Sequence, residues 1–414
     1  MSLSDTSSLC PICSASLPSS HIHWHVENHF QDDAPSADLE LARQISLTPT
    51  TASWHPQDYQ FHDLLLARDL QLAQQLAFAP PSPTPPQTTN QEKDAESTHS
   101  ITRTTASCDE DIDLVSRISH LARFQIRDEF HQVKDGLMSL LKNCLESEND
   151  SSTILSGYVD HFESVGSVDW GWGCGWRNIQ MLSSHLLMER KEARSVLFGG
   201  AGFVPNIASL QRWLEIAWKR GFDTLGSDQF ENTLIGSKKW IGTTECATLF
   251  RSFGLKARVV DFGPKESESL YLSVPSGNGF EKTKAKGQQV LFDWVWNYFA
   301  GDTAANANSL RLAISRKMPL YFQHDGHSRT IIGVQVKPQH GGKPNCSLLI
   351  LDPSHKTAAL EKSLEINLGW QKLIKRGVHT LKKSQYQLCY IDPGIAYGEE
   401  LEQLKVLDSV FFDI

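Results

Sequence analysis

The sequence predicts an α+β fold, because helix-type and strand-type apolar patterns both occur after residue 109. Short apolar runs bounded by turn-forming residues predict strands. These runs are Ala257–Phe262, Leu320–Gln323, Thr330–Val336 and Leu348–Asp352. Apolar residues spaced alternately by four and three predict one face of a long helix. They are Ile126, Phe130, Val133, Leu137, Leu140 and Cys144.

The chain divides into five zones. Residues 1–35 are rich in Cys and His, and residues 36–78 carry a helical apolar pattern. Residues 79–108 are rich in Pro, Ser, Thr and charge, which is typical of a disordered linker. Residues 109–150 are predicted to form a helical arm, and residues 151–414 keep the apolar content expected of one large domain.

The formal net charge of −9 disfavours a phosphate backbone as the main partner. The eight cysteines are sparse, and only Cys10 and Cys13 lie close together in a motif, so we expect a reducing compartment with free thiols or metal ligands. The first residues lack the pattern of a secretory signal, and no apolar run approaches the roughly 18–20 residues of a membrane helix. We therefore expect a protein of the nucleus and cytoplasm with no membrane partner.

One cysteine stands out because glycines and tryptophans surround it. Residues 169–178 read DWGWGCGWRN around Cys174, and residues 177–191 have helical apolar spacing without Pro or Gly. A helix start stabilises an anion, so the pKa of this thiol is expected to fall toward the reactive thiolate. The glycines leave room for a substrate backbone, and the tryptophans are predicted to wall a slot for glycine-like residues. The alternative is a packing cysteine in a Trp-rich core.

A base and an orienting carboxylate are predicted on a β-hairpin. His327 precedes the strand-like run 331–336, and Asp352 ends the next run after a turn-rich stretch. Pairing these two residues places the turn next to residue 340, near a Gly-Gly sequence, and makes them cross-strand neighbours. A thiol, an imidazole and a carboxylate then serve as nucleophile, base and orienter.

Other side chains near this hairpin leave alternatives open. His324 lies three residues before His327 and, on an extended strand, would point to the opposite face. His355 closely follows Asp352 and offers another Asp/His pair. A further alternative is that His327 and Asp352 are ordinary residues at strand ends with no catalytic role. Gln323 is either a donor to a developing oxyanion or an ordinary strand-end amide.

The chain resembles the zinc-finger-containing ubiquitin peptidases, which are related to the proteases that process the ubiquitin-fold modifier UFM. The blocks that carry the resemblance occur in order between residues 155 and 390. They are GWGCGWRN (171–178), KWIG (239–242), VDF (260–262), Leu291-Phe with Trp294 and Asn297-Tyr298, QHDGHSRT (323–330), LILDP (349–353) and KSQYQ (383–387). The resemblance implies a papain-like cysteine peptidase domain over residues 151–414.

The resemblance also assigns roles to particular residues. The catalytic cysteine, histidine and aspartate and the oxyanion glutamine correspond to Cys174, His327, Asp352 and Gln323. In the UFM-processing relatives a histidine directly follows Asp-Pro, whereas here Ser354 intervenes, which favours the ubiquitin branch. The resemblance further implies a preference for long, non-degradative ubiquitin chains of DNA-damage signalling. Residues 112–146 match the place of an arm that grips the distal ubiquitin, or else form a plain core helix.

The N-terminal zone has the ligand types and spacing of a zinc finger. The pattern is Cys10-x2-Cys13-x11-His25-x3-His29, with His21 and His23 as spare candidates. Residues 1–42 contain no Lys or Arg, so this finger is not expected to bind nucleic acid. The resemblance makes it a ubiquitin-binding finger that holds structural zinc.

Residues 36–78 contain three copies of Asp-Leu-x-Leu-Ala-x-x-(Leu/Ile), at 38–45, 63–70 and 69–76. The pattern resembles the ubiquitin-interacting helix called MIU, in which a small Ala lets a partner approach between leucines. A plain amphipathic core helix is the alternative, and which copy binds stays open.

These observations together predict a cysteine peptidase that hydrolyses isopeptide bonds in polyubiquitin and needs no cofactor for catalysis. Ubiquitin and polyubiquitin chains are the expected partners. The alternatives are a protease for a UFM-type modifier and a ubiquitin-binding adaptor with an inactive peptidase fold.

Overall fold

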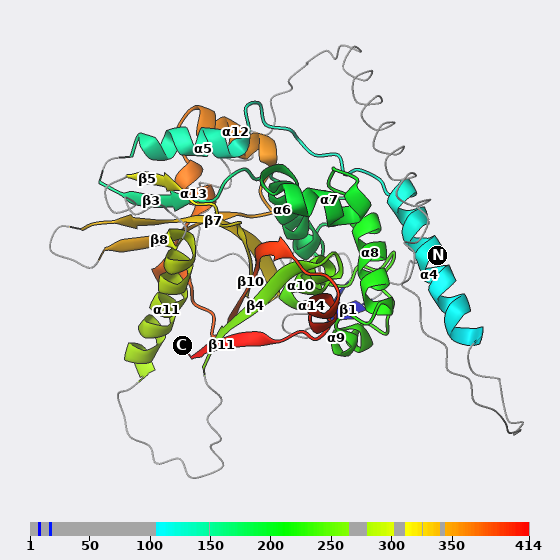
Figure 1. Ribbon diagram of the computed structural model, residues 1–414. Coiled ribbons are helices and arrows are strands. Elements are labelled where there is room, and N and C mark those ends of the chain that lie inside the picture. Colours follow the sequence, from blue (N-terminus) through cyan, green and yellow to red (C-terminus); the bar gives the residue numbers. More distant parts are fainter. Residues whose placement is uncertain are drawn as a thin grey trace, which may run out of the picture.

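The computed structural model describes the backbone of residues 7–9 and 16–18, and then residues 105–148, 150–264, 280–301, 311–324, 326–339 and 344–413 (Figure 1). Its helices are α4 (Thr105–Phe124), α5 (Leu137–Glu146), α6 (Cys174–Glu189), α7 (Lys191–Val196), α8 (Ile207–Lys219), α9 (Thr224–Gln229), α10 (Thr243–Ser252), α11 (Phe280–Ala300), α12 (Thr357–Glu365), α13 (Trp370–Ile374) and α14 (Glu399–Gln403). The 3-10 helices are η2 (Leu197–Gly200) and η3 (Val378–Thr380). Its strands are β1 (Ser7–Leu9), β2 (Ser16–Pro18), β3 (Ser152–Leu155), β4 (Leu255–Gly263), β5 (Leu312–Ile314), β6 (Leu320–His324), β7 (His327–Lys337), β8 (Asn345–Leu351), β9 (Lys375–Gly377), β10 (Tyr386–Ile395) and β11 (Ser409–Asp413).

Nine strands of the described part form one mixed sheet. Its order is β11-β4-β10-β6-β7-β3-β5, and β8 and β9 lie on the other side of β7. β4 with β11 and β3 with β5 are parallel, whereas the pairs that β6, β7, β8 and β10 form are antiparallel. The four predicted strands correspond to β4, β6, β7 and β8, so the predicted mixture of helices and hairpin-linked strands is confirmed.

Strand β7 is the centre of the sheet, because β6 and β3 pair with one of its edges and β8 with the other. A register shift lies between Ile331 and Gly333 in the pairing with β8. A Cβ atom at Gly333 would lie 2.4 Å from the carbonyl oxygen of Ile154, so only glycine lets β3 approach here. The start of β7, where His327 lies, pairs instead with the end of β6.

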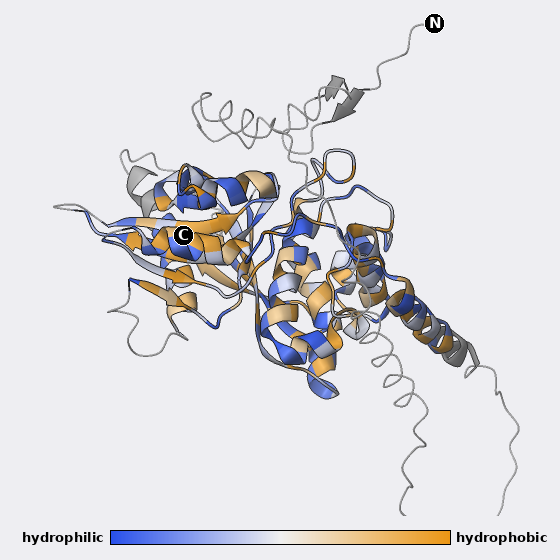
Figure 2. Ribbon diagram, turned by 90° about the horizontal axis from the view of Figure 1, so that it is seen from above, coloured by the Kyte–Doolittle hydropathy of each residue, from blue (hydrophilic) through white to orange (hydrophobic). Residues whose placement is uncertain are grey.

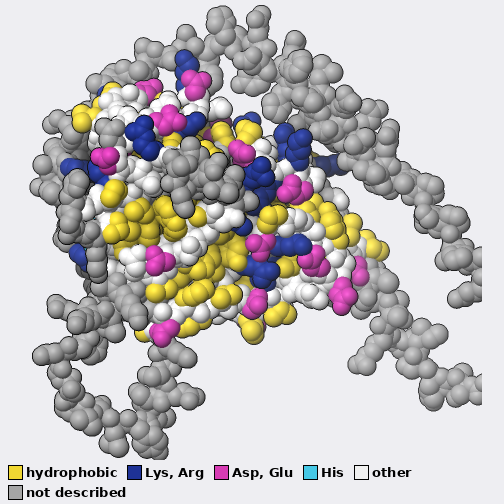
Figure 3. Space-filling model, turned by 60° about the vertical axis from the view of Figure 1, so that its left-hand side comes forward, with side chains coloured by type: hydrophobic (Ala, Val, Ile, Leu, Met, Phe, Trp, Pro, Cys, Tyr) yellow, Lys and Arg dark blue, Asp and Glu magenta, His cyan; other side chains and the backbone are white. Residues whose placement is uncertain are grey.

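Helices cover both faces of the sheet. α6 and α10 pack on one face, where Trp176 and Phe250 belong to the larger buried hydrophobic cluster. α11 covers the other face, and its Leu291 and Val295 join a smaller cluster. Figure 2 shows the hydrophobic residues on the strands and on the helix faces between them. Figure 3, turned so that the left-hand side of Figure 1 comes forward, shows hydrophobic side chains gathered over a broad area of the surface in view.

The prediction of one long helix over residues 126–144 is wrong. The chain leaves α4 before this segment, and Arg127 forms an isolated β-bridge with Pro205. Asp135 and Gly136 then have φ values of 62° and 83°, a left-handed conformation that ends any helix, and α5 begins at the next residue. The apolar spacing was real, but edge pairing and a glycine turn override it.

The N-terminal predictions mostly lie outside the described residues. β1 and β2 form an antiparallel pair, and the segment that connects them in sequence contains Cys10 and Cys13. The side chains of the four predicted zinc ligands and the helices predicted for residues 36–78 are not described. Within the described residues, every helix is too short or too polar to cross a bilayer.

Candidate active site

A buried ion pair fixes the start of α6, where Cys174 is the first residue after Gly173. Arg177 donates from Nε and Nη2 to the two oxygens of Asp169 at 3.0 and 2.8 Å, and the Asp169 side chain is fully buried. The same carboxylate accepts the N–H of Val165 at 2.9 Å, while the Asp169 carbonyl accepts that of Gly173 at 2.7 Å. The ion pair therefore holds the loop that presents the sulfur.

The glycine after Cys174 allows a close approach to the chain before α10. A Cβ atom at Gly175 would lie 2.6 Å from Ile241 Cγ1 and 2.7 Å from the Ile241 carbonyl oxygen. Trp176, in contrast, is fully buried in the core, and Trp172 packs partly buried against the same cluster. The prediction that the tryptophans of this motif wall a slot is therefore wrong for these two, because α6 turns Trp176 inward and Trp172, in the turn before the helix, packs on the core.

The thiol of Cys174 is half-buried and hydrogen-bonds His327 and Ser328. Burial raises the pKa of the thiol, but the bond and charge of His327, helped by Ser328, outweigh burial and lower it overall. Burial lowers the pKa of His327, but the charge and hydrogen bond of Asp352 and the hydrogen bond to Cys174 together outweigh burial and raise the pKa to about 9. Near neutral pH these shifts favour a thiolate beside an imidazolium.

A buried asparagine ties the helix of the thiol to the strand of the imidazole. Asn178 donates from Nδ2 to the Cys174 carbonyl at 2.7 Å and to Ser328 Oγ at 3.2 Å. Its Oδ1 accepts from Thr330 Oγ1 at 2.7 Å. Alternation along β7 directs Ser328 and Thr330 toward α6, so one amide sets the spacing between the two elements.

The register of β7 and β8 differs by two residues from the predicted one. Thr330 pairs with Leu351, which places Asp352 level with Arg329 and not with His327. The prediction of direct cross-strand partners is therefore wrong, because Lys337 pairs with Asn345, which centres the hairpin turn at residue 341, further along the chain than predicted. His327 and Asp352 are nevertheless in contact, since Nε2 lies 3.3 Å from each carboxylate oxygen.

The two competing histidines have environments of their own. His324 is the cross-strand partner of His327, so both rings lie on the same face of the sheet, 6.2 Å apart between centroids. The prediction of opposite faces is wrong, because the chain reverses between them. His355 is half-buried, and burial lowers its pKa to about 4, so its ring is neutral near pH 7. Its interaction is with Asp352, and Cys174 interacts with His327 instead.

Gln323 is oriented by the first turn of α10. Its Oε1 accepts the backbone N–H of Thr243 at 2.9 Å, which directs the amide NH2 group elsewhere. A Cβ atom at Gly242 would lie 2.6 Å from the same Oε1, so glycine is required beside it. Gln323 thus has its acceptor occupied and its donor available, which is what an oxyanion donor needs.

A row of polar side chains crosses four strands and ends beside the thiol. In register, Asp261 of β4 pairs with Gln387 of β10, Gln387 with Gln323 of β6, and Gln323 with Ser328 of β7. Gln387 donates to Asp261 at 2.6 Å and accepts from Thr243 Oγ1 at 2.7 Å. These hydrogen bonds hold Gln387 in place, and Gln387 is the cross-strand neighbour of Gln323.

A cavity of about 200 Å³ joins these groups. Its lining combines the two helix starts, the β6–β7 turn and the segment before α10. The lining residues are Cys174, Gln229, Phe230, Trp240, Ile241, Gly242, Thr244, Glu245, Gln323, Gly326, His327, Ser328 and Gln387. Trp240 crosses over Gly326, where a Cβ atom would lie 2.7 Å from the indole ring. The aromatic wall of the cavity therefore includes Trp240, which belongs to the KWIG block (239–242) that the family resemblance pointed out.

The supporting residues were not singled out from the sequence. Asp169, Arg177 and Asn178 stand inside the same motif as Cys174, and charged or amide side chains in an apolar segment are the signal that would have found them. Gln387 and Arg329 carried no such signal, because only the strand register brings them to the site.

Comparison with known proteins places this geometry in a family. Residues 148–389 match peptidase family C78. The chain is 36% identical to zinc finger-containing ubiquitin peptidase 1 of Rattus norvegicus over 259 residues, which are 62% of this chain and 40% of that protein. It is 30% identical to ubiquitin carboxyl-terminal hydrolase mug105 of Schizosaccharomyces pombe over 264 residues, 64% of this chain and 93% of that protein.

A solved structure of UfSP from C. elegans aligns with a TM-score of 0.37 and 14% identity, covering 60% of this chain and 35% of that chain. The chain spans only 40% of the length of the Rattus norvegicus relative, but nearly the whole length of the Schizosaccharomyces pombe one. The family match covers more than half of the chain and includes both helix starts and the β6–β7–β8 hairpins. The chain belongs to peptidase family C78.

Proposed function

We propose that this protein is a deubiquitinating cysteine peptidase, with Cys174 as nucleophile, His327 as acid and base, and Asp352 as orienter. The observation that carries the proposal is the Cys174 thiol at a helix start, hydrogen-bonded to an imidazole that contacts a buried carboxylate. Gln323 is the proposed oxyanion donor. Catalysis uses side chains only.

The reaction proceeds in two displacements. The Cys174 thiolate attacks the carbonyl carbon of the isopeptide bond, a C–S bond forms, and the negative oxygen accepts from the Gln323 amide. The C–N bond then breaks as His327 gives its proton to the leaving lysine amine. Water attacks the thioester while His327 takes its proton, the C–S bond breaks, and the thiolate is restored with release of the acid.

Ubiquitin is the proposed substrate because its tail ends in two glycines and the cavity is shaped by close contacts. Gly175, Gly242 and Gly326 each stand where a Cβ atom would lie less than 3 Å from a neighbouring group. Trp240 closes over the cavity beside Gly326. The names of the relatives from Rattus norvegicus and Schizosaccharomyces pombe both specify ubiquitin, which supports the same substrate.

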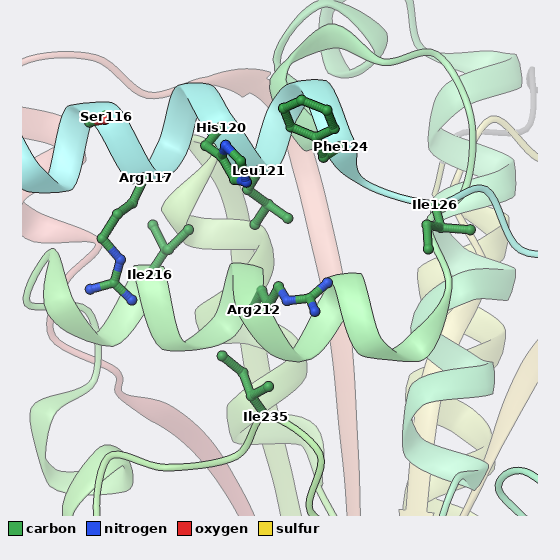
Figure 4. A pocket seen from close by; sticks show the side chains of 9 residues that line it. All are labelled: Ser116, Arg117, His120, Leu121, Phe124, Ile126, Arg212, Ile216 and Ile235. Atoms are coloured by element: carbon green, nitrogen blue, oxygen red, sulfur yellow. The ribbon is translucent and has the colours of Figure 1, made fainter.

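A groove beside α4 supports the use of longer chains. It lies between α4 and α8, with a volume of about 630 Å³ (Figure 4). Its lining consists of Ser116, Arg117, His120, Leu121, Phe124, Ile126, Arg212, Ile216 and Ile235. Two of the lining residues, Phe124 and Ile126, are 63% and 58% exposed. Since exposed apolar side chains beside a groove favour protein docking, we assign this surface to the distal ubiquitin.

We extend the proposal to the N-terminal zones. A zinc-bound finger formed by Cys10, Cys13, His25 and His29, together with the helices of residues 36–78, would hold further ubiquitins of one chain. Two thiolates and two imidazoles are a donor set that suits tetrahedral zinc. Long, non-degradative chains, of the kind used in DNA-damage signalling, are the substrates that several binding sites in a row would select.

Electrophile probes test the proposal. Ubiquitin and UFM, each bearing an electrophile at the C-terminus, are offered in parallel to the full chain and to Cys174→Ala. We expect labelling by the ubiquitin probe that disappears in Cys174→Ala. Labelling by the UFM probe alone would overturn the substrate, and ubiquitin-chain cleavage that persists in Cys174→Ala would overturn the mechanism.

A further inference from the structure

The orienting carboxylate has a closer partner than the imidazole. Arg329 donates from Nε to Asp352 Oδ2 at 2.5 Å, whereas His327 Nε2 lies 3.3 Å from the same oxygen. Strand register explains the difference, because Arg329 is level with Asp352 and His327 is two residues away. Ser354 donates from its N–H and Oγ to the other oxygen, Oδ1, at 2.9 and 2.8 Å. The carboxylate is thus clamped from both sides.

The guanidinium is itself held by His324. Its Nη1 contacts His324 Nε2, and an arginine can only donate, so that nitrogen must be the unprotonated one. Burial and the cation of Arg329 lower the pKa of His324 to about 2, which keeps the ring neutral and able to accept. Phe322 and Tyr386 pack against the ring at 5.5 and 6.0 Å between centroids. His324 is therefore a fixed acceptor.

We propose that Arg329, oriented by His324, is a positioning residue for the catalytic base: it clamps the Asp352 carboxylate and offsets part of its charge on His327. This inference rests on the proposed function. A buried carboxylate with only an imidazolium for company would hold that proton tightly, and a base that keeps its proton is a poor donor to a leaving amine. The guanidinium lets Asp352 orient the ring without trapping the proton.

Four ionisable groups surround His327. They are Asp352, which follows β8, Arg329 on β7, Cys174 on α6 and the neutral His324 on β6. Burial and Arg329 act to lower the pKa of His327, and Asp352 acts to raise it. Removing the guanidinium therefore raises the pKa of His327 further.

Histidine NMR of the full chain tests the inference without any substrate. The ring of His327 is followed against pH in the wild type, Arg329→Gln and Arg329→Lys, with kcat/KM on a fluorogenic ubiquitin substrate measured in parallel. For Arg329→Gln we expect an alkaline shift of the His327 midpoint, the same shift in the falling limb of kcat/KM, and roughly a tenfold lower maximum. Arg329→Lys should restore the midpoint but only part of the rate, since an ammonium lacks the planar fork.

The control is Arg258→Gln, which breaks an exposed pair with Asp392 and should leave both readouts unchanged. Should Arg329→Gln fail to fold, His324→Leu and His324→Gln serve instead: the first should shift the midpoint, and the second, which keeps an acceptor, should shift it less. An unshifted midpoint in a folded Arg329→Gln or His324→Leu protein overturns the inference. A shifted midpoint in a chain that cleaves no ubiquitin substrate supports the inference and overturns only the proposed function.

Discussion

The cavity lies between two helix starts that are built alike and used differently. α6 begins after Gly173 and carries the thiol, whereas α10 begins after Gly242 and carries the N–H that orients Gln323. Behind Gly173 stands the buried ion pair already described. Behind Gly242 stands a single carboxylate, since Glu245 Oε2 accepts the Gly242 N–H at 2.6 Å.

The two helix starts differ in how strongly they are held because they carry different groups. In the proposed mechanism the first turn of α6 holds a sulfur that becomes anionic and whose proton moves during turnover, and a two-point ion pair resists its displacement. The first turn of α10 only has to hold a neutral amide at one hydrogen bond. Burial also raises the pKa of Glu245, so the α10 start depends on a carboxylate that is less securely ionised.

Breaking the ion pair behind α6 is expected to have the largest effect. Asp169→Asn keeps the shape of the side chain but leaves Arg177 with a buried charge that only Asp128 still pairs. We expect a loss of about 3–5 kcal/mol in the free energy of unfolding, measured by urea denaturation. The matched control is Asp392→Asn in the exposed pair with Arg258, where the loss should stay below about 1 kcal/mol. Equal losses would mean that the α6 start is not specially braced.

Crowding the start of α10 should affect the rate and not the fold. Gly242→Ala places a methyl group against Gln323 Oε1, and we expect kcat/KM on a ubiquitin substrate to fall about 10²-fold through the displaced amide. Gly166→Ala is the control, because a Cβ atom there meets open space. In a Gln323→Ala background, Gly242→Ala should cost little more. A full additive loss in the double variant would show that Gly242 acts through another residue.

The same two starts show what a sequence discloses and what it does not. Cys174 was singled out because a thiol between glycines at a predicted helix start suits a nucleophile, and the strands around His327 were predicted from their apolar runs. The role of Gly242 and Thr243 was not evident, because an ordinary glycine and a backbone N–H acquire meaning only when β6 brings Gln323 beside them.

The register between strands was the second feature that the sequence did not predict. The hairpin prediction brought His327 and Asp352 together but placed the turn too early in the chain, because the turn-rich stretch 337–345 offers several positions that suit a turn. That error of two residues concealed Arg329, the nearest partner of the carboxylate. Likewise, alternation along an assumed continuous strand put His324 on the wrong face, because the tight reversal before His327 was not recognised.

The ionisation of Cys174 and His327 should make the reaction rate depend on pH. Since the pKa of Cys174 is lowered and that of His327 is raised to about 9, kcat/KM should rise with pH as the thiol ionises, then fall as pH passes about 9 and the imidazolium loses its proton. The falling limb should be about tenfold per pH unit. Rates that continue to climb above pH 10 would rule out an obligatory imidazolium. Gly242→Ala should lower this curve without moving its limbs, because the α10 start holds a neutral amide.

The smallest effect is expected where a change reaches neither helix start. Replacing both Cys10 and Cys13 by Ser in the full chain removes two of the four predicted zinc ligands, and metal analysis should fall from one zinc per chain to none. Labelling by a single-ubiquitin probe should keep its rate, because both starts and the cavity are intact. Cleavage of long chains should slow several-fold, because a lost binding site lowers the effective concentration of the chain at the thiol. Equal slowing of probe labelling and chain cleavage would mean that the finger acts on the catalytic step itself. Its proposed role in binding the chain alone would then be wrong.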